Sequence, residues 1–120
     1  MIKKLLVLLI ATLTLAKELM LVAITHQSCP VCQQWHKEVA PIYPDQALQK
    51  HLPFLKEYDV ASKADRQWVS SHIGVIQYLP TFVVMDGDYV VEKFVGYTSV
   101  PDFFKELNEV LMKGEAASAS

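Results

Sequence analysis

The sequence predicts an α/β fold with a four-stranded mixed sheet and helices on both faces. One observation is the order of segments, in which runs of strand length alternate with runs of helical period as βαβαββα. The other is the position of the only two cysteines, Cys29 and Cys32, where the first strand leads into the first helix. We expect the first two strands to be parallel, with a right-handed crossover, and the last two to form an antiparallel hairpin.

The first strand is expected at residues 18–24, which are almost continuously apolar, as in a strand covered on both faces. The first helix is expected at residues 30–40. Pro30 suits its first position, because the fixed φ angle is helical and the missing N–H would be unpaired there. One face of this helix is apolar and is predicted to turn toward the core; it carries Val31, Cys32, Trp35 and Val39.

The middle of the chain predicts a strand and a helix. Residues 54–60 alternate weakly, as in a second strand. Ser62, with Asp65 three residues later, is a typical N-cap for the second helix. That helix is expected to end near Gly74 and to turn Trp68 and Val69 inward.

The last third of the chain predicts a hairpin and a helix. Residues 81–85 read as a strand, Asp86-Gly87 as a turn, and residues 89–95 as the returning strand. Ser99 can cap the final helix. Its apolar residues recur at helical spacing: Phe103, Phe104, Leu107, Val110 and Leu111.

The N-terminus has the features of a signal peptide. Lys3 and Lys4 precede an uncharged, mostly apolar run at residues 5–15, and small residues lead to Ala16. The run is shorter than the roughly 20 apolar residues that a spanning helix needs. We expect cleavage after Ala16, which makes 1–16 the signal peptide, and export to an oxidising compartment, where disulfides persist. Retention as a short signal-anchor is the alternative.

The remaining chain is expected to form one monomeric domain at residues 17–113, followed by a flexible tail at 114–120. The formal net charge is −2, and there is no basic cluster. Nucleic acid is therefore not an expected partner.

The Cys-x-x-Cys spacing predicts redox chemistry. With Pro30 at the first helical position, Cys29 is the N-cap, where its sulfur can accept the N–H groups of Val31 and Cys32. These bonds and the helix dipole favour the thiolate, and cysteines in such motifs have pKa values of roughly 3.5–7.5 against about 8.5 for free cysteine. We expect Cys29 to attack and Cys32 to resolve, with no bound cofactor, because the two sulfurs carry the electrons.

The spacing of the cysteines also bears on two other interpretations. A purely structural disulfide is disfavoured, because so short a ring constrains the unfolded chain little. A metal site would use His26, Cys29, Cys32 and His36. Zinc sites of the Cys₂His₂ type have a longer spacer between the ligand pairs, which disfavours that interpretation.

Several motifs together resemble the thioredoxin superfamily over about residues 18–112. They are the Cys-x-x-Cys at a strand-to-helix junction, Leu79-Pro80-Thr81 at the start of a strand, a hairpin, Gly96 and a final helix. The resemblance implies a thioredoxin-like fold in which Pro80 follows a cis peptide bond and packs beside the cysteines. It also implies that Leu79 offers its backbone to the substrate.

Three strings are similar to SoxS-type thioredoxins, periplasmic proteins linked to bacterial sulfur oxidation: CPVCQQWH at 29–36, EVAPIYP at 38–44 and PTFVVMD at 80–86. This resemblance implies a periplasmic reductase that acts on a disulfide or persulfide at a partner protein's reactive cysteine. A membrane thiol-electron carrier would be its reductant. A disulfide-donating oxidant of folding proteins is the alternative in the same class.

The chain departs from common thioredoxins at one chemically important position. They carry a buried Asp six residues before the first cysteine as a proton acceptor, and Ala23 stands there in this chain. The base for Cys32 is therefore unassigned. His36, one turn after Cys32, and His26, in the loop before Cys29, are the candidates.

Overall fold

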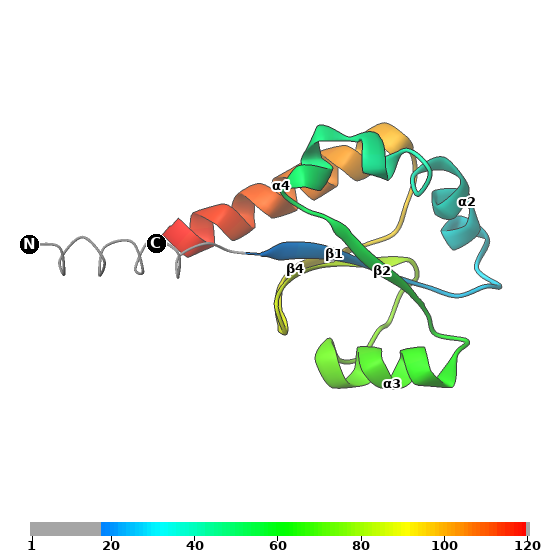
Figure 1. Cartoon of the computed structure of the whole chain (residues 1–120). Helices are drawn as coiled ribbons and strands as arrows, with labels where there is room; N and C mark the ends of the chain where they lie inside the picture. The colour runs from blue at the N-terminus through cyan, green and yellow to red at the C-terminus, as the bar shows by residue number, and fades with distance from the viewer. Residues whose placement is uncertain (1–17, 120) are drawn as a thin grey trace, which may run out of the picture.

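The computed structural model describes residues 18–119 (Figure 1). The predicted signal peptide, residues 1–16, lies outside the described residues. The elements follow the predicted order: β1 (Leu19–Thr25), α2 (Pro30–Glu38), the 3₁₀ turns η1 (Tyr43–Asp45) and η2 (Ala47–Lys50), β2 (Phe54–Asp59), α3 (Lys63–His72), β3 (Thr81–Asp86), β4 (Tyr89–Val95) and α4 (Val100–Ala119). Among residues 18–119, no helix is long and apolar enough to cross a membrane.

The four strands form one mixed sheet in the order β2-β1-β3-β4. Strand β1 pairs in parallel with β2 and antiparallel with β3, and β3 and β4 form the antiparallel hairpin. Gly87 in the hairpin turn has a φ of 60°, which glycine adopts without a steric penalty. Helices α2 and α4 cover one face of the sheet and α3 covers the other (Figure 1). The predicted fold class is confirmed.

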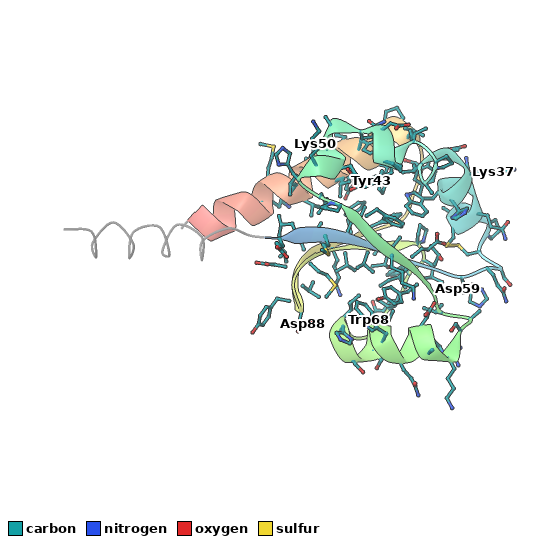
Figure 2. All side chains as sticks on the ribbon, viewed as in Figure 1. Lys37, Tyr43, Lys50, Asp59, Trp68 and Asp88 are labelled. Atoms are coloured by element: carbon teal, nitrogen blue, oxygen red, sulfur yellow. A yellow bond between two sulfur atoms is a disulfide. The ribbon has the colours of Figure 1, made fainter. Side chains whose placement is uncertain are left out.

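The core has two layers because the sheet is covered on both sides. Leu21 and Ala23 of β1 belong to the cluster under α2 and α4, whereas Val22 and Ile24 belong to the cluster against α3. All four are fully buried. Successive side chains of a strand point to opposite faces, so a strand covered on both faces must be apolar throughout. Figure 2 shows the two layers, with Tyr43 on one side of the sheet and Trp68 on the other.

The register of the sheet gathers three segments at one end. Thr25, the last residue of β1, pairs with Asp59, the last residue of β2. Ile24 pairs with Thr81, the first residue of β3. The loop at residues 26–29 and the start of α2 therefore lie between the end of β2 and the start of β3. This is the carboxyl end of the central strand, where open α/β sheets place their sites.

Two expectations for the helices differ from the structure. Val31 is 40 % exposed rather than turned to the core, because it lies in the first turn of α2, beyond the end of β1. Helix α4 continues to Ala119, whereas the sequence predicts a tail from residue 114. Alanine and glutamate, which make up much of that segment, are strong helix formers, so the backbone continues the helix there.

Candidate active site

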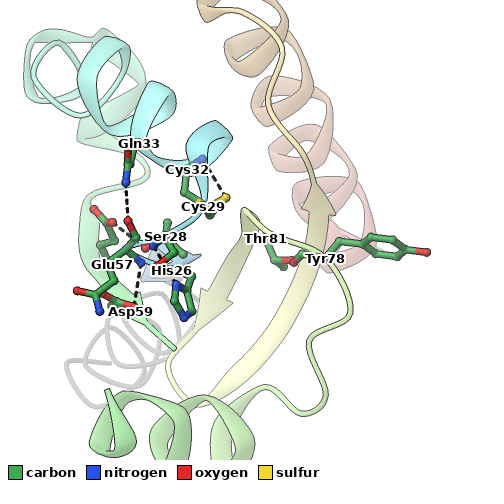
Figure 3. The surroundings of a disulfide bond; sticks show 11 residues. His26, Ser28, Cys29, Cys32, Gln33, Glu57, Asp59, Tyr78 and Thr81 are labelled. Carbon is green, nitrogen blue, oxygen red and sulfur yellow. Dashed lines mark hydrogen bonds between the residues drawn. A yellow bond between two sulfur atoms is a disulfide. The ribbon is translucent and has the colours of Figure 1, made fainter. Parts of the chain in front are cut away.

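Cys29 and Cys32 form a disulfide at the start of α2 (Figure 3). Cys29 is the N-cap, with extended backbone angles of −86° and 112°. Its sulfur accepts a hydrogen bond from the N–H of Cys32 at 3.1 Å, one of the two donors that the sequence predicts. Pro30 occupies the first helical position, and the Gln33 N–H bonds the Cys29 carbonyl at 3.1 Å. The predicted cap is confirmed.

The two sulfurs differ in their access to solvent. Cys32 is 2 % exposed and packs on the inner side of α2, as Trp35 does one turn later. Cys29 is half-buried at the rim of the helix end. A partner molecule can therefore approach Cys29, while Cys32 is shielded behind it.

The loop before the disulfide is held by a set of hydrogen bonds. The Gln27 N–H donates to Asp59 Oδ1 at 3.3 Å, and Gln33 Nε2 donates to the Gln27 carbonyl. The Cys29 N–H donates to the carbonyl of His26 at 2.9 Å. These bonds tie the loop to the end of β2 and to α2, so the position of Cys29 is defined from both sides.

The predicted proline lies at the same end of the sheet. The Leu79–Pro80 peptide bond is cis, as the resemblance implies. Pro80 is buried, and its carbonyl accepts the Gly96 N–H at 2.8 Å. Figure 3 shows Tyr78 and Thr81, on either side of this dipeptide, in the surroundings of the disulfide.

The two candidate histidines have different partners. His26 Nδ1 accepts the Ser28 N–H at 2.9 Å, so this ring nitrogen shapes the loop. His36 has a side chain that is 65 % exposed, and its Nδ1 lies 2.8 Å from Glu57 Oε1 on β2. Glu57 is a functional candidate that the sequence analysis missed. The sequence signal that could have indicated Glu57 is its charge within the expected strand at residues 54–60, because a charged side chain in a strand needs a polar partner or solvent.

An open pocket of about 710 Å³ lies between the start of α2 and the ends of β1 and β2. Cys32, His36 and Glu57 all line it. Within the described part of the chain, no three His, Cys, Asp or Glu side chains come together in a way that could hold a metal ion.

A family model described as a thioredoxin-like domain matches residues 9–111, which is most of the chain. The chain belongs to the thioredoxin-like family. The thioredoxin-like fold and the Cys29–Cys32 pair at the start of α2 together make it a thiol–disulfide oxidoreductase.

Solved thioredoxin structures share this fold. The periplasmic thioredoxin SoxS from Paracoccus pantotrophus, in its reduced form, superposes with a TM-score of 0.62 at 24% sequence identity. The match covers 80% of this chain and 98% of the SoxS chain. The Thermus thermophilus thioredoxin has a TM-score of 0.64 at 22% identity, covering 83% and 78%. The Fasciola hepatica thioredoxin has a TM-score of 0.59 at 19% identity, covering 89% and 90%. No curated protein sequence matches this thioredoxin-like chain.

Proposed function

We propose that this protein is an exported reductase of a disulfide or persulfide at the reactive cysteine of a partner protein. The observation that carries the proposal is the asymmetry of the pair. Cys29 sits half-buried at a helix N-cap, and Cys32 is 2 % exposed behind it. An accessible first sulfur and a shielded second sulfur suit attack by Cys29 followed by resolution by Cys32.

The proposed reaction moves two electrons from the cysteine pair to the substrate. The Cys29 thiolate attacks a sulfur of the partner and forms a mixed disulfide, which displaces a thiolate from a disulfide substrate or hydrosulfide from a persulfide. Cys32 then loses its proton and attacks the Cys29 sulfur, which releases the partner and forms the Cys29–Cys32 disulfide. A disulfide substrate yields two thiols, and a persulfide yields a thiol and hydrogen sulfide. A membrane thiol carrier would return the electrons.

We assign substrate binding to two residues at the same end of the sheet as the cysteine pair. Leu79 and Pro80 precede β3, at the end of the sheet where β1 leads into the Cys29 loop. We propose that the Leu79 backbone pairs with an extended segment of the partner and that Pro80 shapes the groove. The active unit is a monomer without a bound metal or cofactor.

Support for the reducing direction and for the periplasm comes from similarity. SoxS from Paracoccus pantotrophus is a periplasmic thioredoxin. The three strings at 29–36, 38–44 and 80–86 resemble that group. In addition, Pro30 and Val31 bring no charged or imidazole group between the cysteines to stabilise the Cys29 thiolate further, which disfavours a strong oxidant.

The first test is the reduction potential of the pair in a glutathione or thioredoxin redox buffer. We expect a value near the thioredoxin potential of about −270 mV, and a value near about −120 mV would identify an oxidant instead.

The second test is capture of the partner. The Cys32→Ser variant should accumulate mixed disulfides in the periplasm, with Cys29→Ser as the matched control that captures nothing. Metal analysis of reduced protein tests the metal interpretation separately.

A further inference from the structure

The shielded position of Cys32 makes the loss of its thiol proton a difficult step when it resolves the mixed disulfide. The Cys32 thiol must lose its proton before it can attack, yet the residue is only 2 % exposed. Burial disfavours the thiolate, so a nearby proton acceptor accelerates this step. Ala23 of β1, where common thioredoxins carry a carboxylate, offers none.

The sheet register places a carboxylate beside that vacant position. Ala23 is the register partner of Glu57 on the neighbouring strand β2. Paired residues of adjacent strands present their side chains to the same face of a sheet. Ala23 belongs to the cluster under α2, so Glu57 also lies on the side of the helix that carries Cys32.

Two hydrogen bonds hold the Glu57 carboxylate in place. The Thr25 hydroxyl donates to Oε2 at 2.8 Å, and His36 Nδ1 lies 2.8 Å from Oε1. Thr25 comes from β1 and is 2 % exposed, whereas His36 comes from α2. The carboxylate is therefore fixed between a strand and the helix, and its side chain is only 27 % exposed.

Glu57 and Cys32 face the same space. Both line the open pocket of about 710 Å³ behind the disulfide, which has room for a chain of water molecules. Figure 3 shows Glu57 on the β2 side of the loop, across from the cysteines. The other titratable groups that line this pocket come from the loop, β2 and α2: His26, Asp59, His36, Lys37 and Glu38.

We propose that Glu57 accepts the proton of the Cys32 thiol through water in this pocket, with Thr25 and His36 as positioning residues. The proton moves from Cys32 Sγ to the carboxylate, and the new thiolate attacks Cys29 Sγ. The bond between Cys29 and the partner breaks, and the partner leaves as a thiolate. This role for Glu57 rests on the proposed thiol–disulfide exchange at Cys29 and Cys32. It holds whether the protein reduces or oxidises its partner, because Glu57 returns the proton to Cys32 when the Cys29–Cys32 disulfide is reduced.

The test uses Ellman's reagent, an aromatic disulfide, in excess over reduced protein in a stopped-flow instrument. The first aromatic thiolate reports attack by Cys29, and the second reports resolution by Cys32. For Glu57→Gln we expect an unchanged first phase and a second phase slower by about tenfold or more at neutral pH. A positioned general base typically contributes about 10²–10⁴-fold, and we expect the smaller effect because water can take the proton in its place. The deficit should shrink as pH rises above the ordinary thiol pKa of about 8.5, where solvent removes the proton.

Controls separate this role from a structural one. Glu38→Gln removes a carboxylate from the same pocket, but Glu38 is exposed at the last residue of α2, away from the first turn that carries Cys32, so both phases should be unchanged. Acetate should accelerate the second phase of Glu57→Ala, which a loss of structure would not allow. Unfolding curves of each variant establish that it is folded.

Three results overturn the proposal. The first is a Glu57→Gln second phase equal to that of wild type at neutral pH. The second is a slowdown that is the same at every pH, which indicates a structural role. The third is a large slowdown in His36→Gln with none in Glu57→Gln, which makes His36 the acceptor. The proposal expects a smaller slowdown in His36→Gln, and no further loss when that change is added to Glu57→Gln.

Discussion

Cys29 and Cys32 are three residues apart and chemically alike, so their difference arises from position alone. In reduced protein at neutral pH, we expect iodoacetamide to modify Cys29 at least about tenfold faster, because Cys29 lies at the helix N-terminus and Cys32 is 2 % exposed. Peptide mapping by mass spectrometry measures both rates. In denaturant the two rates should converge, and faster modification of Cys32 in the folded protein would reverse the assigned roles.

Tyr43 shows how one buried hydroxyl contributes to stability. It is 2 % exposed, and its hydroxyl donates to the Leu52 carbonyl at 2.6 Å. Tyr43→Phe leaves that carbonyl without its partner, so we expect the free energy of unfolding to fall by about 1–2 kcal/mol. Urea unfolding at neutral pH measures the change, and an unchanged value would show that water replaces the hydroxyl. The rate of disulfide exchange should be unaffected.

The same residue makes stability depend on alkaline pH. Burial raises the pKa of Tyr43, so the folded protein retains the proton where the unfolded chain has lost it. The contribution is present below the unfolded value of about 10 and falls as pH rises beyond it. We expect wild type to lose stability more steeply than Tyr43→Phe above about pH 10. Parallel curves for the two proteins would contradict this expectation.

At the scale of an element, the cap of α3 illustrates a local signal with a local effect. Ser62 Oγ accepts the Asp65 N–H at 3.3 Å, as the sequence predicts. Ser62→Ala should lower the free energy of unfolding by about 1 kcal/mol, because an N–H of the first turn loses its acceptor. Ser71→Ala, at an exposed position of the same helix, is the matched control and should be neutral or slightly stabilising. Equal effects in urea unfolding would mean that the cap contributes nothing.

At the scale of the whole molecule, the aromatic cluster under α2 and α4 joins the site to the rest of the fold. Phe82 is fully buried, with ring centroids 5.2 Å from Trp35, 5.1 Å from Phe94 and 4.9 Å from Phe103. Phe82→Ala should cost about 3–5 kcal/mol of unfolding free energy, because it removes a large buried ring and leaves a cavity. That is a large part of the roughly 5–15 kcal/mol of a typical domain.

Chemical denaturation followed by circular dichroism tests this expectation, with Val90→Ala, which is 39 % exposed on β4, as the control. A loss below about 1 kcal/mol for Phe82→Ala would falsify the view that this cluster is the main core.

Much of the fold and part of the site follow from patterns between near neighbours in the chain. The almost continuously apolar β1, the Ser62 cap and the cap formed by Cys29 each depend on residues a few positions apart. The cis bond before Pro80 required the family resemblance, because the short sequence around a proline does not distinguish a cis from a trans bond, and the packing of Pro80 beside the cysteines stays a prediction. The N-terminal segment and the direction of exchange stay predictions.

The sequence by itself determined where the redox pair lies, which cysteine caps the helix and the order of strands and helices along the chain. Only the tertiary structure decided what surrounds Cys32. A shift in register between Leu21 and Val22 sets Glu57 opposite Ala23, and α2 then brings His36 onto the carboxylate. A slip of one residue in the strand pairing moves a strand's side chains to the other face of the sheet. The alternation of apolar and polar residues within β2 is too weak to decide which face Glu57 occupies. The register depends on packing between strands that are 32 residues apart at Thr25 and Glu57, so it is settled only when the chain folds.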